Sequence, residues 1–274
     1  MHQGFICPVC FQPLQREERR YLCPKGHMYD RASSGYVNLA MNQSSSLKRH
    51  GDDKRMIRAR TEFLNTGAYR CLSDRLVDIS SELLADGESF LDAGCGEGYY
   101  TALLAERLRK EEKSCTLLGI DVSKEALSAA EKRKAGLLLA VASVFHLPVA
   151  DESISLVWNV FAPAAGEEYS RVLRPGGHLI RVFPLEEHLM GLKERIYETV
   201  YPNRPQIPEF EGLELVDTRY IRETLTLSTR QEIAALFAMT PYYYKTSAED
   251  QAKLADVESL STPIAFGISV YRKK

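Results

Sequence analysis

Long hydrophobic runs are missing from this sequence, and no stretch approaches the ~18–20 apolar residues that span a bilayer. The N-terminus, Met-His-Gln-Gly-Phe-Ile-Cys, also lacks the basic segment and apolar core of a secretory signal. We therefore expect a cytoplasmic protein without membrane contact. Structural disulfides are rare in that compartment, so the six cysteines require another explanation.

A strong net charge is also absent: the formal charge is −2 over 274 residues. This balance hides an asymmetry, because residues 1–70 carry +6 and residues 71–274 carry −8. The split suggests an anionic partner for the N-terminal part. The alternative is that a basic and an acidic module dock on each other.

Three of the cysteines lie in a short N-terminal pattern, Cys7-Pro-Val-Cys10 followed by Cys23-Pro-Lys-Gly-His27. Two closely spaced pairs of thiol and imidazole ligands suit tetrahedral zinc. A redox C-x-x-C site would leave Cys23 and His27 unexplained. Four protein ligands close the coordination sphere, so the sequence predicts a structural zinc site made of Cys7, Cys10, Cys23 and His27.

The chain around this pattern predicts three parts: a zinc-binding, RNA-recognising module in residues 1–38, a linker and basic helical segment in 39–70, and a larger second domain in 71–274. Four cations between or beside the zinc ligands favour contact with an RNA backbone; they are Arg16, Arg19, Arg20 and Lys25. The serine-rich stretch 42–46 reads as a loop. The basic run 48–60 is either a solvated helix face or a further phosphate contact. The other cysteines, Cys71, Cys95 and Cys115, show no pairing pattern.

A glycine-rich turn follows a short apolar run at residues 89–91 and precedes a helical pattern. Strand, glycine turn and helix form a nucleotide-binding cleft at the carboxyl end of a parallel sheet. The third glycine of the dinucleotide fingerprint is absent, because Tyr99 occupies its position. Gly94-Cys-Gly-Glu-Gly98, preceded by the acid Asp92, instead resembles the first motif of class I S-adenosylmethionine-dependent methyltransferases.

The next apolar run, residues 116–120, ends in Asp121, which lies 25 residues after Gly96. A carboxylate at that strand end can accept hydrogen bonds from both ribose hydroxyls of a nucleoside cofactor. Taken alone, the glycine turn could also be an ordinary tight loop. The acid at the end of the next predicted strand, Asp121, makes a cofactor site the better interpretation.

The remaining pattern predicts an α/β fold with a mostly parallel sheet and an antiparallel last strand. We expect strands at 137–142, 154–160, 178–183, 212–228 and 264–272. Helices are expected over 61–86, 167–173, 229–238 and 247–260, with a turn at Arg174-Pro-Gly-Gly177.

Three motifs together closely resemble the RlmA/TlrB-type methyltransferases, which modify N1 of a guanine in a hairpin of 23S ribosomal RNA. They are the zinc pattern, His27-x-Tyr-Asp-x-Ala-x-x-Gly-Tyr-Val-Asn-Leu39, and Arg60-x-x-Phe-Leu-x-x-Gly-x-Tyr69. The resemblance extends to about Lys193 and returns at Met239-Thr-Pro241. It implies zinc, S-adenosylmethionine and 23S ribosomal RNA as ligands, and cofactor contacts at Tyr69, Gly96, Glu97 and His188.

Plain structural roles also exist for two of these residues, since Tyr69 suits packing between module and sheet and His188 suits helix capping.

On the substrate side, the run Trp158-Asn-Val-Phe-Ala-Pro163 lacks the Asp/Asn-Pro-Pro-aromatic motif of many exocyclic-amine methyltransferases. This fits a ring-nitrogen target. Asn159 is a candidate for orienting the base and Phe161 for stacking on it, with strand-end packing equally open for both. The sequence identifies no catalytic base.

Two rival functions remain at this stage. A small-molecule methyltransferase of the same fold would leave the zinc module and the basic N-terminal segment without a role. A non-enzymatic zinc-ribbon RNA-binding protein would have no need of Gly94, Gly96, Gly98 and Asp121. The oligomeric state stays open, and a homodimer is compatible with the pattern.

Overall fold

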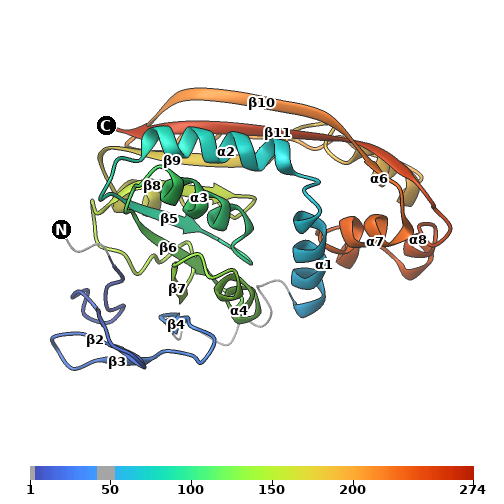
Figure 1. Ribbon diagram of the computed structural model, residues 1–274. Coiled ribbons are helices and arrows are strands. Elements are labelled where there is room, and N and C mark those ends of the chain that lie inside the picture. The colour runs from blue at the N-terminus through green and yellow to red at the C-terminus, as the bar shows by residue number, and fades with distance from the viewer. Residues whose placement is uncertain (1–3, 42–52) are drawn as a thin grey trace.

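The computed structural model describes residues 4–41 and 53–274, and its main feature is one eight-stranded sheet (Figure 1). The strand order is β10-β11-β9-β8-β5-β6-β7-β4. The bounds are β4 Val37–Asn38, β5 Ser89–Ala93, β6 Thr116–Asp121, β7 Leu138–Val141, β8 Ile154–Val160, β9 Leu173–Pro184, β10 Leu213–Leu227 and β11 Leu260–Lys273.

Parallel pairing runs from β4 through β7, β6, β5 and β8 to β9, and β11 is antiparallel to both β9 and β10. The predicted fold class is therefore confirmed. All five residues of β5 are buried, as expected for a central parallel strand with both faces covered. The carboxyl ends of β5, β6, β7 and β8 lie next to one another, so the loops after them meet at a single site.

Helices cover both faces of the sheet. On one face lie α2 (Arg70–Leu83) and α3 (Tyr99–Lys110), whose apolar side chains share a core with Phe90, Trp158 and Ile180. On the other face α5 (Gly166–Val172) packs with residues of the N-terminal module in a second core. None of the helices in the described part of the chain is long and apolar enough to cross a membrane.

The N-terminal module forms its own small sheet from β1 (Gln15–Arg16), β2 (Arg20–Leu22) and β3 (Met28–Asp30), all antiparallel. Its chain then joins the large sheet, because Val37 of β4 pairs in parallel with Ala140 of β7. A second attachment is the bridge between Phe5 and Val149. The module is thus held to the large sheet by backbone hydrogen bonds at two places.

Several predicted element bounds change in the structure. The helix expected over 61–86 is divided into α1 (Lys54–Asn65) and α2, because Gly67 adopts a φ of +81° between them. The turn expected at Arg174–Gly177 is instead part of β9, where Gly176 has a φ of +75°. The helix expected over 247–260 shortens to α8 (Ala248–Ala252). The serine-rich stretch 42–46 lies outside the described residues.

β10 and β11 extend beyond the sheet as a long two-stranded ribbon (Figure 1). The connection between them carries α7 (Arg230–Ala238), the short 3-10 helix η1 (Tyr243–Lys245) and α8. α7 packs against α1, which places the described part of the basic run, residues 53–60, at this end of the molecule (Figure 1). Residues 48–52 of that run lie outside the described residues. The helix α4 (Lys124–Lys132) follows β6, and α6 (Met190–Ile196) packs against β11.

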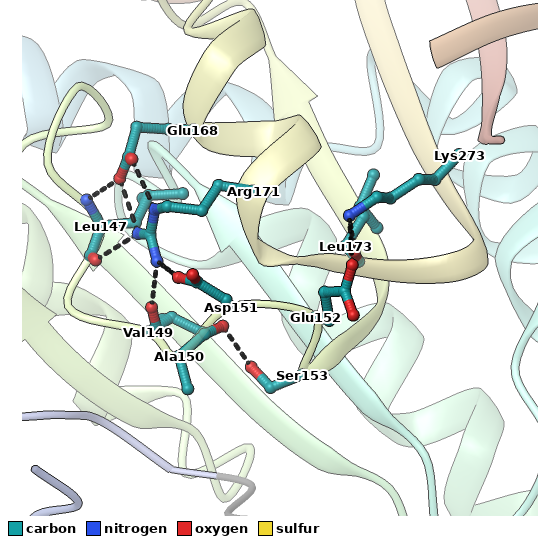
Figure 2. A network of polar contacts seen from close by, with 10 residues as sticks. All are labelled: Leu147, Val149, Ala150, Asp151, Glu152, Ser153, Glu168, Arg171, Leu173 and Lys273. Atoms are coloured by element: carbon teal, nitrogen blue, oxygen red, sulfur yellow. Dashed lines mark hydrogen bonds and ion pairs between the residues drawn. The ribbon is translucent and has the colours of Figure 1, made fainter. Parts of the chain in front are cut away.

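A single arginine fixes the connection between β7 and β8 on which the module docks (Figure 2). Arg171 of α5 donates to the carbonyl oxygens of Leu147 at 2.9 Å and Val149 at 2.8 Å. Its guanidinium also pairs with Glu168 at 2.7 Å and Asp151 at 2.6 Å. Because Val149 also pairs with Phe5, Arg171 indirectly supports the attachment of the zinc module.

We expect Arg171→Gln to lower the free energy of unfolding by about 2–3 kcal/mol, because half-buried carbonyl groups and Glu168 lose a charged donor. Urea unfolding followed by the fluorescence of Trp158, the single tryptophan, measures this loss. Arg272→Gln is the control, since its pair with Glu214 is exposed on both sides. A loss no larger than that of the control would contradict the role given to Arg171.

Candidate active site and zinc centre

The four predicted zinc ligands converge in the structure. Their ligand atoms all lie within 4.8 Å of one another. Nδ1 of His27 lies 3.5 Å from Sγ of Cys7 and 3.3 Å from Sγ of Cys23, and Sγ of Cys10 lies 3.6 Å from Sγ of Cys23. Zinc bonds of ~2.0–2.3 Å in a tetrahedron separate ligand atoms by about 3.5–3.8 Å. The cluster therefore has the ligand set and the spacing that zinc requires.

Tyr29 of β3 supports the thiolate form of one ligand. Its hydroxyl lies 3.1 Å from Sγ of Cys7. Burial opposes ionisation of this thiol, but hydrogen bonds from Tyr29 and from the backbone of Cys10 and Val9 outweigh it and lower the pKa of Cys7 to about 6. Since thiolate is the form that binds zinc, Tyr29 is a supporting residue that the sequence pattern did not single out.

The glycine turn joins β5 to α3 and packs against the loop after β8 and against α4. Gly94 has a φ of +98°, and a Cβ atom there would lie 2.6 Å from Cβ of Ala162 after β8. Gly98 has a φ of +70°, and its Cβ would lie 3.1 Å from Cβ of Ala130. Gly96 faces more open space, with Nη1 of Arg60 at 3.7 Å from the position of its Cβ. Gly94 and Gly98 are thus required by positive φ angles and by close packing of the chain on the turn, whereas Gly96 is the most open of the three.

Asp121 ties this turn to the end of β6. Its Oδ2 accepts a hydrogen bond from the backbone N–H of Gly96 at 3.0 Å, and its Oδ1 accepts one from Ser123 at 2.8 Å. The structure thereby brings together two predicted cofactor residues that are far apart in sequence. Their contact with a ribose stays a prediction.

Three acids gather around the turn: Asp92, Glu97 and Asp121. Asp92 is buried and accepts a hydrogen bond from the hydroxyl of Thr101. Burial, together with the charges of Asp121 and Glu97, raises the pKa of Asp92 to about 7. Glu97 is also buried, and its backbone carbonyl accepts a hydrogen bond from Nε of Arg133 at 2.8 Å. Clustered carboxylates suit a cofactor that carries a sulfonium and an ammonium group.

Tyr69 and His188, the other predicted cofactor residues, meet in an aromatic cluster around Phe266. Nε2 of His188 lies 3.5 Å from the hydroxyl of Tyr69. Phe266 packs against Tyr69, His188 and Phe161, with ring centroids 5.0, 4.7 and 5.8 Å away respectively. Because Ala162 contacts the glycine turn, Phe161 connects this cluster with the turn.

His188 is held as a neutral imidazole. Its Nδ1 accepts a hydrogen bond from the backbone N–H of Ala265 at 3.1 Å, which assigns the ring proton to Nε2. Burial first, and then the charge of Lys193, lower the pKa of His188 to about 3. The ring therefore presents Nε2–H as a donor across the physiological pH range.

This shift predicts a pH dependence of stability. In the unfolded chain His188 takes up a proton below about pH 6.5, whereas the folded protein resists it until about pH 3, so acid lowers the free energy of unfolding in this window. Between pH 7.5 and 5 the wild type should lose about 2 kcal/mol relative to His188→Gln. The raised pKa of Asp92 has the opposite effect, since acid then stabilises the folded state, but this contribution is the same in both proteins. The difference between their unfolding free energies, measured with urea at each pH, therefore isolates the contribution of His188. Parallel profiles would contradict the assignment.

The two substrate-side candidates differ in exposure. Phe161 is 46% exposed at the end of β8 and adopts a φ of +55°, which is uncommon for a residue with a bulky side chain. Asn159 is fully buried, and its Nδ2 donates to the carbonyl oxygens of Ala162 and Pro163 at 3.2 and 3.0 Å. Asn159 thus organises the loop that carries Phe161. Direct contact of either residue with a base remains a prediction.

Two apolar side chains that sequence reasoning missed also border the strand ends. Val122, directly after Asp121, is 43% exposed, and Phe145, shortly after β7, is 52% exposed. Such side chains would pack on the apolar face of the adenine ring of S-adenosylmethionine. Their position at or shortly after predicted strand ends was the signal available in the sequence.

The parallel sheet, the glycine turn with its acids and the attached cysteine–histidine cluster define the class: a class I methyltransferase with an N-terminal zinc ribbon. Family models agree, since residues 5–45 match the zinc ribbon described as "RlmA, N-terminal" and residues 91–181 match "Methyltransferase domain". S-Adenosylmethionine and structural zinc are the cofactors of this class.

Similarity to known sequences extends over nearly the whole chain. A "Putative 23S rRNA (guanine-N(1)-)-methyltransferase" of Micromonospora griseorubida is 33% identical, over 96% of this chain and 94% of its own. The "23S rRNA (guanine(748)-N(1))-methyltransferase" of Streptomyces fradiae is 34% identical, over 69% and 66%. A further relative, from Bacillus subtilis (strain 168), is 27% identical over 98% and 97%. The chain belongs to the RlmA-type family of 23S ribosomal RNA (guanine-N1)-methyltransferases.

Proposed function

We propose that this protein transfers the methyl group of S-adenosylmethionine to N1 of a guanine in a hairpin of 23S ribosomal RNA. The observation that carries the proposal is the attachment of a zinc-ligand cluster, through Phe5–Val149 and β4–β7, to a sheet whose glycine turn suits a sulfonium cofactor. A small-molecule methyltransferase would have no use for that attached module. Ribosomal RNA as substrate also supports a cytoplasmic location.

In this proposal the cofactor lies along the carboxyl ends of β5 and β6. Gly94, Gly96 and Gly98 allow its close approach, Asp121 accepts from the ribose, and Glu97, Tyr69 and His188 complete the contacts. When bound, S-adenosylmethionine supplies an activated methyl group. The protein then mainly has to position the guanine nitrogen in line with it, and positioning of this kind contributes ~7–11 kcal/mol.

The zinc ribbon in residues 1–38 recognises the RNA, and residues 71–274 carry out the transfer. Exposed Arg16, Arg19 and Arg20 lie on or beside β1 and β2 of the ribbon and offer positive charge to phosphates. A guanine inside a hairpin has to leave its stack to reach the methyl group, and exposed Phe161 offers a ring on which the base can stack.

Methyl transfer to a hairpin transcript of 23S ribosomal RNA tests this function. With a labelled methyl donor, we expect incorporation into the RNA and none into an extract of small metabolites. Because a methyl group on N1 blocks base pairing, primer extension should stop next to one guanine of the hairpin. Replacing that guanine with adenine should remove both signals. Labelling of metabolites alone would support the small-molecule alternative, and binding of RNA without methylation would support the non-enzymatic one.

A further inference from the structure

A polar groove of about 610 Å³ lies outside the cofactor contacts described above. The turn between α1 and α2, the outer face of α3 and the connection between α4 and β7 form its walls. Four cations line it, and they come from all three walls: Arg70, Arg109, Arg133 and Lys134. A volume of this size is large enough for two or more phosphate groups.

The positive charge of the groove is only weakly compensated. Its single acidic lining residue, Glu106, already pairs with Lys110 at 2.7 Å. Within residues 4–41 and 53–274, neither Arg109 nor Lys134 forms an ion pair, and both are exposed. Arg70 pairs with Asp74 at 3.3 Å, but its side chain remains 77% exposed. An anion entering the groove would therefore meet several available donors.

Arg133 is the least exposed of the four cations. Its Nη1 donates to Asn65 at 3.2 Å, and its guanidinium lies over the ring of Tyr99 at 5.3 Å. Its Nη2 is buried and makes no hydrogen bond in the described part of the chain, with the Glu97 carboxylate 4.0 Å away. Arg133 therefore borders the groove with a guanidinium whose position is already fixed by its neighbours.

We propose that this groove binds backbone phosphates of the RNA strand that flanks the target guanine, an inference that rests on the proposed function. Arginine and lysine on three converging elements match the repeated charge of an RNA backbone better than they match a single small anion. The groove is also connected to the cofactor turn, because Nε of Arg133 holds the carbonyl of Glu97. RNA bound here would lie directly behind the residues that hold the methyl donor.

The double variant Arg109→Gln/Lys134→Gln removes two of the four cations without touching zinc or cofactor residues. The matched control is Arg75→Gln/Lys132→Gln, which removes the same charge from exposed positions on α2 and α4 that do not line the groove. Fluorescence anisotropy with the 23S hairpin transcript measures the Kd over a range of salt concentrations. We expect a Kd about 10-fold or more above the control, and a log–log salt slope smaller by about 1.5.

The outcomes separate this proposal from the proposed function. If the wild type methylates the hairpin but the double variant binds it like the control, the groove proposal is overturned and the function stands. If the wild type binds through the groove but never methylates, the function is overturned and the groove stands. Calorimetry with inorganic phosphate and pyrophosphate tests the other source of the ligand. Groove-dependent binding of these ions together with unchanged RNA affinity would also overturn the proposal.

Discussion

Replacing Cys23 with serine should release the zinc ion and abolish methylation of the RNA hairpin, while the affinity for S-adenosylmethionine largely survives. Structural zinc contributes ~10–16 kcal/mol to the folding of small finger modules, and the three short strands of this ribbon offer little apolar core to replace it. Cofactor binding should persist because the glycine turn and Asp121 belong to β5, β6 and their loops, in the interior of the large sheet.

Zinc content by elemental analysis, methyl incorporation and cofactor affinity by calorimetry give the three readouts. Cys115→Ser is the control, since this cysteine lies before β6 and takes no part in the metal cluster. Cys7→Ser should behave like Cys23→Ser. Full RNA methylation by a metal-free variant would show that the ribbon does not select the substrate.

The zinc site was predictable from the sequence because its ligands occur in two local pairs. The two members of each pair are three or four positions apart, so a short turn alone sets the distance between them. Predicting Cys7 and Cys10 as zinc ligands therefore required no knowledge of the rest of the fold. The glycine turn was predictable for the same reason, since strand, turn and helix follow one another directly in the chain.

Contacts between distant segments were not predictable in this way. Val37 was placed in the module, yet it pairs with Ala140 in the large sheet, and a two-residue strand has no measurable periodicity. Arg133 reaches Asn65, 68 residues earlier in the chain, and nothing in either local sequence indicates this contact. The groove that they help to form is therefore a product of tertiary structure alone.

Asn159 shows a second kind of limit. The sequence correctly predicts that Asn159 lies near the end of a strand. It does not predict the direction of the side chain, because neighbouring side chains of a strand point to opposite faces and a shift of one residue in register reverses them. The structure points its amide toward the loop of Ala162 and Pro163, where it holds the backbone that carries Phe161. A residue considered for base recognition is thus also a support for its exposed neighbour.

Replacing Asp121 with alanine should raise the Kd for S-adenosylmethionine by about 10–100-fold. The carboxylate accepts hydrogen bonds from the backbone of Gly96 and Ser123, and bonds to a charged acceptor contribute about 1.5–3 kcal/mol each. Its loss would loosen the glycine turn and remove the acceptor proposed for the ribose. Calorimetry with S-adenosylmethionine measures the change.

Asp121→Asn separates these two effects, because the amide keeps the shape and one acceptor oxygen but loses the charge. We expect an intermediate Kd for this variant, with zinc content unchanged in both. Asp217→Ala on the outer strand β10 is the matched control for loss of an acid far from the site. An unchanged Kd in Asp121→Ala would remove this residue from the cofactor site and leave the glycine turn as its main determinant.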